Sequence, residues 1–162
     1  MSTSIPPHRI VVVGNGMVGH KYLETLCAQL ALSGQRTAYH ITVLCEEKRP
    51  AYDRVQLSAY FSGSTAEDLS LVQGDFFAEN GIVLHLGEAV SHIDRAARSL
   101  LTNQGRSLGY DTLVLATGSY PFVPPVPGHE RENCFVYRTI EDLEAITAAG
   151  KEAKVGAVVG GG

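Results

Sequence analysis

The chain contains a glycine pattern of the kind that binds phosphate groups. Residues 14–19 carry glycines at the spacing G-x-G-x-x-G, after a β-branched run at 10–13 and before apolar residues at helical spacing over 17–32. In such a strand–turn–helix, the first glycine makes a tight turn, the second lets the backbone approach a pyrophosphate, and the third lets helix and strand pack closely. Six residues are therefore predicted to bind a dinucleotide diphosphate at a helix N-terminus: Gly14, Asn15, Gly16, Met17, Val18 and Gly19. The alternative is a glycine turn that binds nothing.

An acidic residue follows the next predicted strand. Residues 40–45 indicate a second buried strand, and Glu46 comes directly after it, with Glu47 as the alternative. The acid lies somewhat beyond the usual ~20 residues after the last glycine. A carboxylate here accepts hydrogen bonds from ribose hydroxyls and disfavours a 2′-phosphate, which fits NAD and FAD equally.

The rest of the chain continues this α/β pattern. A hydroxyl-x-x-acid capping box at Thr65–Asp68 predicts a short helix, and a second at Thr139–Asp142 opens a helix to about residue 149. The other predicted elements are a helix along 17–32, a helical turn at 75–80, strands at 82–86, 112–116 and 155–159, and an antiparallel meander over 89–93, 99–102 and 107–110. The last predicted strand runs into Gly160–Gly162 and repeats the pattern of the first strand with its glycines, so we expect a second βαβ unit to begin here.

Composition excludes several classes of protein. The chain has 162 residues and a formal net charge of −4, which gives no basic footprint for nucleic acid. No apolar run reaches the ~20 residues of a membrane span, and the N-terminus has no secretory signal, so we expect a cytoplasmic protein without membrane contact. Cys27, Cys45 and Cys134 are widely spaced, which argues against a disulfide scaffold or a zinc site; Cys27 and Cys45 are expected to be buried.

Three blocks of the chain together resemble the two-dinucleotide-binding flavoproteins, also called the pyridine nucleotide–disulfide oxidoreductase family. They are the first glycine turn, the block from Tyr110-Asp111 to Ala116-Thr117-Gly118, and the final valines with Gly160–Gly162. The resemblance implies a Rossmann-like domain with a parallel sheet and a small antiparallel meander. It implies FAD at the first turn, Ala116, Thr117 and Gly118 beside the flavin nucleotide, the backbone of Val90 at the adenine, and NAD(P)H at the second turn of the complete protein.

A narrower resemblance is to the large subunits of assimilatory NAD(P)H nitrite reductases. It rests on residues 14–20, 45–47, 51–55, 57–58, 60–62 and 135–143. It implies that FAD takes hydride from NAD(P)H and passes electrons toward the reduction of nitrite to ammonia, with sirohaem and iron–sulfur clusters only downstream of these residues. A small nitrite reductase subunit and a homo-oligomer are the implied protein partners.

Departures from the wider family narrow the class. The segment 50–63 holds no cysteine, unlike disulfide reductases, and Ala59 stands where ferredoxin and rubredoxin reductases often carry a lysine. Arg54 is interpreted as a contact to the FAD phosphates or adenosine; the alternative is a surface pair with Asp53 or Glu47. We name no general acid or base, because the cofactor performs the chemistry. The alternative functions are the FAD module of a ferredoxin or rubredoxin reductase and a non-catalytic dinucleotide-binding fragment.

The family pattern also implies a domain division. Residues 1–120 are predicted to form an FAD-binding domain that lacks its C-terminal return segment, 121–150 a connecting segment, and 151–162 the first strand and glycine turn of a truncated NAD(P)H-binding domain. Residues 1–162 alone are therefore expected to bind FAD weakly or not at all and to show no NADH-dependent turnover.

Overall fold

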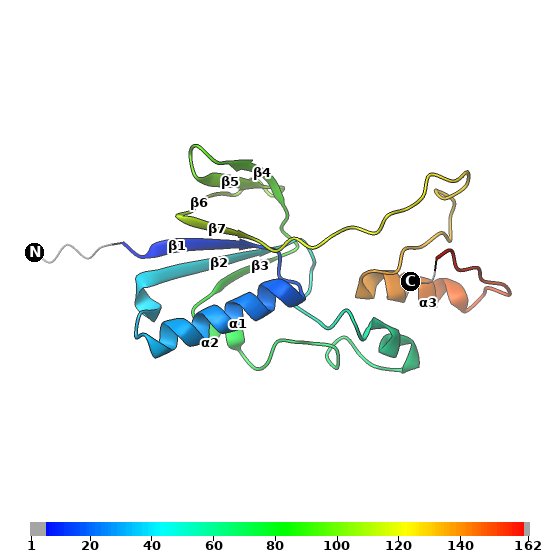
Figure 1. Ribbon diagram of the computed structural model, residues 1–162. Coiled ribbons are helices and arrows are strands. Elements are labelled where there is room, and N and C mark those ends of the chain that lie inside the picture. Colours follow the sequence, from blue (N-terminus) through cyan, green and yellow to red (C-terminus); the bar gives the residue numbers. More distant parts are fainter. Residues whose placement is uncertain (1–5, 161–162) are drawn as a thin grey trace, which may run out of the picture. The chain divides into compact units, whose positions relative to one another are not determined.

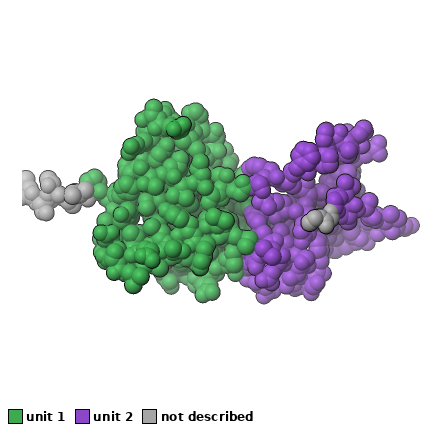
Figure 2. All heavy atoms as spheres, in the orientation of Figure 1, with its two compact units in different colours: residues 1–52, 70–118 green, residues 53–69, 119–162 purple. Residues whose placement is uncertain are grey.

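A computed structural model describes residues 6–160 of the chain (Figure 1). These residues divide into two compact units, shown in different colours in Figure 2. The first unit comprises residues up to 52 and residues 70–118, and the second comprises residues 53–69 and those from 119 onward. Among residues 6–160, no helix combines the length and the apolar character needed to cross a bilayer.

A parallel four-stranded sheet forms the centre of the first unit. Its order is β3 (Val83–Leu86), β2 (Tyr39–Cys45), β1 (His8–Val13) and β7 (Thr112–Leu115). The central strands β1 and β2 are β-branched runs whose last residues are all buried, as is typical of a parallel sheet covered on both faces. The predicted α/β class with its parallel sheet is confirmed.

Helix α1 (Met17–Leu32) covers one face of this sheet, together with the short α2 (Phe76–Glu79) (Figure 1). Its buried stripe consists of Gly19, His20, Leu23, Cys27 and Leu30. Of these residues, Leu23, Cys27 and Leu30 pack with β1 and β2 side chains in one core cluster. The apolar spacing in the sequence predicts a stripe of Val18, Tyr22, Leu26 and Leu30, with Leu23 and Cys27 beside it. In the structure Val18 is 75% exposed, and the buried stripe is centred on Leu23 and Cys27 instead. A 3₁₀ turn, η1 (Arg36–Ala38), follows α1 and leads into β2.

An antiparallel meander covers the opposite face of the sheet. It consists of β4 (Val90–Asp94), β5 (Ser99–Thr102) and β6 (Ser107–Gly109), in that order. Leu100 and Tyr110 pack against the alternate β1 residues Val11 and Val13 and against Leu44. The first unit therefore has three layers, helix, parallel sheet and meander; the sequence predicted the parallel sheet and the meander, and the structure adds how they stack.

An ion pair joins the amino-terminal ends of β1 and β7. Two guanidinium nitrogens of Arg9, Nε and Nη2, donate to the Asp111 carboxylate at 3.2 and 3.0 Å. The main-chain amide of Arg9 donates to the same carboxylate at 2.8 Å. These hydrogen bonds hold the pKa of Asp111 well below its usual range. The Tyr110-Asp111 pair thus has a structural role just before β7, at the opposite end of the strand from Gly118.

The second unit contains η2 (Leu57–Ser62) and α3 (Ile140–Gly150). Leu57, Ile140 and Leu143 are buried in this unit, and Phe61 stacks on Tyr137 with ring centroids 6.2 Å apart. The predicted capping box of α3 is present, because Thr139 accepts from the Asp142 amide and the Asp142 carboxylate accepts from the Thr139 amide.

Two predicted elements are wrong. Thr65 and Asp68 exchange the capping-box hydrogen bonds at 3.2 and 2.7 Å, but they close a turn and no helix follows. Residues 155–159 form no strand: Val155, Val158 and Val159 are 88–90% exposed, and within residues 6–160 no strand pairs with them. A β-branched run forms a strand only when a neighbour supplies its hydrogen bonds. The predicted second glycine turn extends into Gly161 and Gly162, which lie outside the described residues.

Candidate dinucleotide-binding site

The first glycine turn joins β1 to α1, as predicted. Gly14 has φ +101°, and a Cβ on it would collide with the carbonyl group of Ala116 at the end of β7. A Cβ on Gly19 would collide with the carbonyl oxygen of Gly14. Both glycines are therefore required by the close approach of backbone to backbone, so their roles in the tight turn and in helix packing follow from the geometry.

Gly16, between them, has open space around it. No heavy atom lies within 4 Å of a Cβ built on Gly16, and its φ of −84° is ordinary. Its conformation therefore does not require glycine. What the absence of a side chain provides is room beside the first amides of α1, which is the space that a diphosphate would need.

The N-cap residue of α1 supplies no side-chain cap. Gly16 occupies this position, so no N-cap side chain accepts from the first amides, and the first turn of α1, all of it among the described residues, holds no acidic residue. In contrast, α3 has the Thr139 cap and two acids, Glu141 and Asp142, in its first turn. The first amides of a helix have no intrahelical acceptor and lie at the positive end of its dipole. The amino end of α1 is thus suited to an external anion.

Two side chains beside this turn are buried. Asn15 is 3% exposed, and neither atom of its amide has a hydrogen-bond partner among the described residues. His20 is also 3% exposed; its Nε2 lies 3.2 Å from the carbonyl oxygen of Leu71, and its ring meets that of Phe76 edge-on at 5.0 Å. Because the Asn15 amide faces the interior, only its main chain is available at the surface of the turn.

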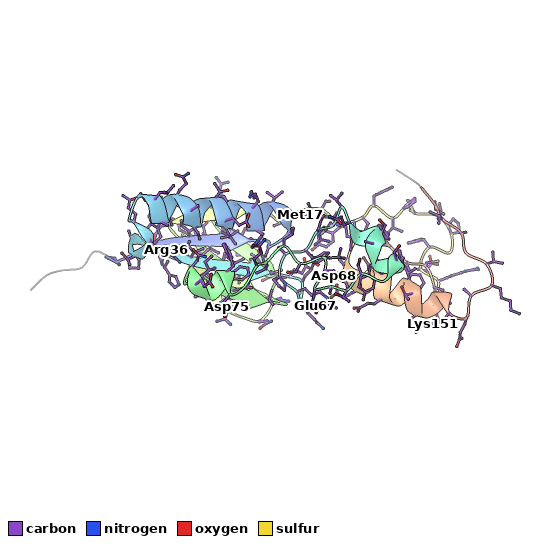
Figure 3. The ribbon with its side chains drawn as sticks, turned by 90° about the horizontal axis from the view of Figure 1, so that it is seen from below. Met17, Arg36, Glu67, Asp68, Asp75 and Lys151 are labelled. Atoms are coloured by element: carbon purple, nitrogen blue, oxygen red, sulfur yellow. The ribbon has the colours of Figure 1, made fainter. Side chains whose placement is uncertain are left out.

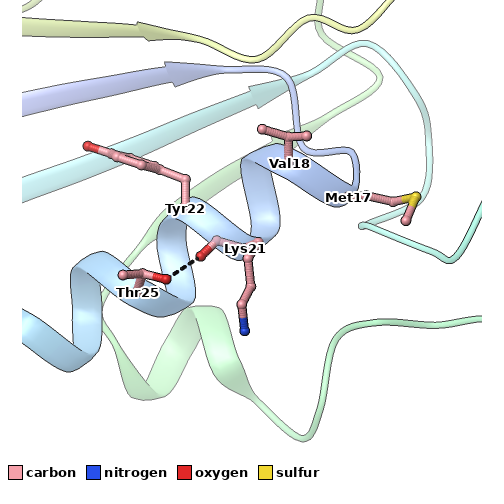
Figure 4. Close-up of a pocket in the computed structure, with 5 residues that line it drawn as sticks. All are labelled: Met17, Val18, Lys21, Tyr22 and Thr25. Atoms are coloured by element: carbon pink, nitrogen blue, oxygen red, sulfur yellow. Dashed lines mark hydrogen bonds between the residues drawn. The ribbon is translucent and has the colours of Figure 1, made fainter.

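A shallow groove runs along the outer side of α1 next to the turn. It has a volume of about 470 Å³ and is lined by Met17, Val18, Lys21, Tyr22 and Thr25 (Figure 4). The Lys21 ammonium is paired with Glu24 at 3.0 Å, and Thr25 donates to the Lys21 carbonyl at 2.9 Å. Met17 stands at the amino end of α1, and Arg36 lies beyond the other end (Figure 3). The side chains of Met17 and Val18 therefore border the turn from outside.

The candidate acid lies at the carboxyl end of β2, beside the turn. The Gly14 amide donates to the Leu44 carbonyl at 2.8 Å, which places the glycine turn against the end of β2. Glu46 is the first residue after the strand and is exposed, whereas Glu47 is half-buried and accepts a 2.8 Å hydrogen bond from the Tyr52 hydroxyl. Of the two carboxylates, Glu46 is the one that faces solvent.

The remaining candidates in the first unit meet at the same edge of the sheet. Ala116 directly follows β7 and donates its amide to the Val13 carbonyl at 2.8 Å; Thr117 and Gly118 come next and are exposed. Val90 begins β4, in the loop region that follows β3. Parallel strands present their carboxyl ends at one edge, and ligands of open α/β sheets bind there. The structure therefore brings the glycine turn, Glu46, Val90 and residues 116–118 to one edge of the sheet.

Arg54 belongs to the second unit. Its Nη1 donates to the carbonyl oxygen of Arg138 at 2.8 Å, just before the N-cap of α3. Neither of the two interpretations drawn from the sequence predicted this contact. This hydrogen bond joins the segment that follows β2 in the sequence to the start of α3, within the second unit.

A buried acid at this edge was missed by the sequence analysis. Glu88 is 2% exposed and accepts hydrogen bonds from Thr102 and Arg106, and the Thr102 hydroxyl is the main cause of a lowered pKa of Glu88. Its partners lie 14 and 18 residues further along the chain, so no local spacing marks it. The only available sign was an acid directly before a predicted strand, which is normally a solvated residue.

The fold and this edge define a Rossmann-like dinucleotide-binding domain, with a parallel sheet, a glycine turn and an uncapped helix N-terminus. The chain belongs to the pyridine nucleotide-disulphide oxidoreductase family, whose family model matches residues 8–162. The resemblance inferred from the three sequence blocks is thereby confirmed.

Individual relatives agree with this assignment. The chain is 56% identical to the nitrite reductase [NAD(P)H] large subunit of Klebsiella oxytoca over 94% of its length, and 49% identical to the nitrite reductase (NADH) large subunit of Escherichia coli K12 over 95%. These matches cover only 16% and 18% of the relatives. Among solved structures, the covalent putidaredoxin reductase–putidaredoxin complex matches with a TM-score of 0.75 and 33% identity, over 90% of this chain and 34% of that one.

Proposed function

We propose that this chain is the FAD-binding part of a flavoprotein oxidoreductase that takes hydride from NAD(P)H and passes electrons toward the reduction of nitrite to ammonia. The observation that carries the binding role is the uncapped N-terminus of α1 with open space at Gly16. The specific nitrite role is supported by the 56% identity to a nitrite reductase large subunit, of which this chain spans about one sixth.

Each candidate residue has a role in this proposal. The amides of residues 14–19 bind the FAD diphosphate, and the Glu46 carboxylate accepts hydrogen bonds from the adenosine ribose. The main chain of Val90 meets the adenine, and residues 116–118 lie beside the flavin nucleotide. Arg54 contacts the phosphates or adenosine from the segment after β2. Glu47 remains the alternative ribose acid, although its hydrogen bond to Tyr52 favours a structural role.

The protein residues bind and orient the cofactor. Bound flavin would supply hydride acceptance and electron transfer, which no side chain can perform. The uncapped amides fit a diphosphate, and the exposed carboxylate of Glu46 fits an unphosphorylated ribose. This chain contributes position and electrostatics, and none of its residues is assigned as a general acid or base.

The complete protein would contain further parts. NAD(P)H binds at the second glycine turn in this proposal, and sirohaem and iron–sulfur clusters are supplied by downstream sequence. A small nitrite reductase subunit and a second copy of the chain are the proposed protein partners, and the cytoplasm is the proposed compartment.

A second candidate is the FAD module of a reductase that serves a separate ferredoxin or rubredoxin. The 33% identity to the putidaredoxin reductase of the solved complex favours it. Downstream sequence separates the two, because cluster-binding cysteines and a sirohaem domain belong to the first alone. A non-catalytic dinucleotide-binding domain would carry no flavin at all.

The cofactor assignment is tested by titrating the full-length polypeptide with FAD, FMN and NAD. FMN lacks the adenosine and the diphosphate, so FAD should bind far more tightly. Loss of a charge-assisted hydrogen bond costs about 1.5–3 kcal/mol, so Glu46→Gln should weaken FAD binding about 10- to 100-fold. Glu47→Gln is the matched control and should leave FAD affinity nearly unchanged. Equal affinities for FAD and FMN, or binding of nicotinamide nucleotide alone, would overturn the proposal.

The electron acceptor is tested separately. The absorbance spectrum of the full-length polypeptide should show flavin and sirohaem bands, and NADH oxidation should depend on nitrite. If NADH oxidation instead requires an added ferredoxin and nitrite has no effect, the reductase alternative is correct.

A further inference from the structure

We propose that Glu88 is a positioning residue for the adenosine end of the cofactor. Through buried hydrogen bonds to the β5–β6 hairpin, it fixes the 87–90 loop, and this loop in turn fixes Glu46 and the main chain of Val90. The inference rests on the proposed FAD site, and it assigns a role there to residues that do not touch the ligand.

The main chain of the loop brackets Glu46. The Glu88 amide donates to the Cys45 carbonyl at 2.8 Å, and the Gly87 amide donates to the Glu47 carbonyl at 2.9 Å. The two acceptor carbonyls belong to the residues directly before and after Glu46. The path of the main chain at Glu46 therefore depends on the position of the 87–90 loop. A carboxylate must be held closely to accept from ribose hydroxyls, since hydrogen bonds weaken steeply with misalignment.

The Glu88 side chain anchors the loop from the other direction. Its Oε1 accepts from Thr102 Oγ1 at 2.7 Å and from Arg106 Nε at 2.9 Å, and its Oε2 lies 3.7 Å from His85 Nδ1. The side chain is 3% exposed, and a buried carboxylate persists only when paired and hydrogen-bonded. Thr102 Oγ1 also accepts from the Arg106 amide at 3.1 Å, which ties both partners into one turn.

The same hairpin holds the residues around Glu88. Asn103 and Ala89 are joined by two hydrogen bonds, from the Ala89 amide to Asn103 Oδ1 at 3.1 Å and from the Asn103 amide to the Ala89 carbonyl at 2.9 Å. Val90 pairs with Thr102 in the meander. The hairpin therefore sets the position of Val90 as well as that of Glu46. Arg106, whose side chain is 44% exposed, affects the site only through its hydrogen bond to Glu88.

The test compares two paired carboxylates at opposite ends of the parallel sheet. Glu88→Gln and Asp111→Asn are made in the full-length polypeptide, and affinities for FAD and ADP are measured well below each melting temperature. Glu88→Gln should weaken FAD and ADP by the same factor, about tenfold, because the effect is confined to the adenosine half. Asp111→Asn should lower the melting temperature and leave both affinities unchanged.

A double mutant shows whether Glu88 acts through Glu46. In a Glu46→Gln background, the effect of Glu88→Gln on ADP affinity should shrink to about twofold or less, since interacting residues are non-additive. Arg106→Gln, at a partly exposed position, repeats the test if Glu88→Gln does not fold. Unchanged FAD affinity in Glu88→Gln or Arg106→Gln, or full additivity with Glu46→Gln, would overturn the inference. A wild-type protein that binds no FAD would instead refute the proposed function.

Discussion

Gly14→Ala and Gly16→Ala add the same methyl group two residues apart, and the structure predicts opposite outcomes for them. At position 14 the new Cβ would lie 2.6 Å from the Ala116 carbonyl carbon and 3.0 Å from the Thr117 nitrogen, and both of these are backbone atoms. At position 16 it meets no heavy atom within 4 Å. The pair therefore separates the glycine that the fold requires from the glycine that the ligand requires.

The magnitude for Gly14→Ala has two parts. A φ of +101° costs an L-residue about 1–2 kcal/mol or more. Relief of the collision must shift the end of β7, where the Ala116 amide donates to the Val13 carbonyl, and this adds about 1–3 kcal/mol. A total of about 2–5 kcal/mol lowers the melting temperature by about 10 °C for a domain of this size.

Gly16→Ala should leave stability within about 1 kcal/mol of the wild type, because the restriction that alanine imposes on the unfolded chain opposes its lower preference for the N-cap position. Its methyl group instead occupies the approach to the α1 amides, so FAD affinity should fall about 100-fold with the loss of charge-assisted hydrogen bonds. Thermal melts and FAD titrations of both variants measure these effects. The reasoning is refuted if Gly16→Ala destabilises the fold as Gly14→Ala does, or if it binds FAD like the wild type.

Two further predictions concern stability. The pKa of Asp111 is lowered by Arg9, so the pair stabilises the fold fully above the ordinary Asp pKa of about 4 and loses this effect as the pH falls below it. The difference in melting temperature between the wild type and Asp111→Asn should therefore be constant from pH 7 to about pH 5 and should shrink progressively as the pH is lowered from about 5 to 2; a difference that stays constant down to about pH 2 would contradict this. Thr139→Ala should cost about 1 kcal/mol and speed amide exchange in α3, whereas Thr65→Ala, in a capping box with no helix behind it, should cost less. Equal losses in the two variants would show that the helix is not what the cap stabilises.

The sequence predicted the strand–turn–helix of the site because each part depends on neighbours in the chain. The run at 10–13, the glycine spacing and the apolar period of α1 are local signals, and the Thr139–Asp142 box marks a helix start that the structure contains. The position of Glu46 beside the turn follows from parallel pairing alone, since strands of one sheet end at one edge.

What the sequence could not show depends on contacts between distant segments. Glu88 is buried because Thr102 and Arg106 arrive from another hairpin. Val18 is exposed because the rotation of α1 is set by the close approach of Gly19 to Gly14. The capping boxes at Thr65 and Thr139 have the same form, and only the second starts a helix, because Ile140 and Leu143 find a buried face to fill.

The two long helices use the same backbone groups for different purposes. In α3 a threonine caps one of the first amides, and two acids of the first turn place negative charge at the amino end, which disfavours an external anion there. In α1 a glycine occupies the N-cap position, and glycine costs only a few tenths of a kcal/mol relative to serine there. A serine at position 16 would satisfy one amide with its own hydroxyl and compete with a diphosphate for it. The absence of a side-chain cap on α1 therefore favours an external anion at little cost to the helix, and this difference between the helices supports the proposal that the cofactor diphosphate binds at α1.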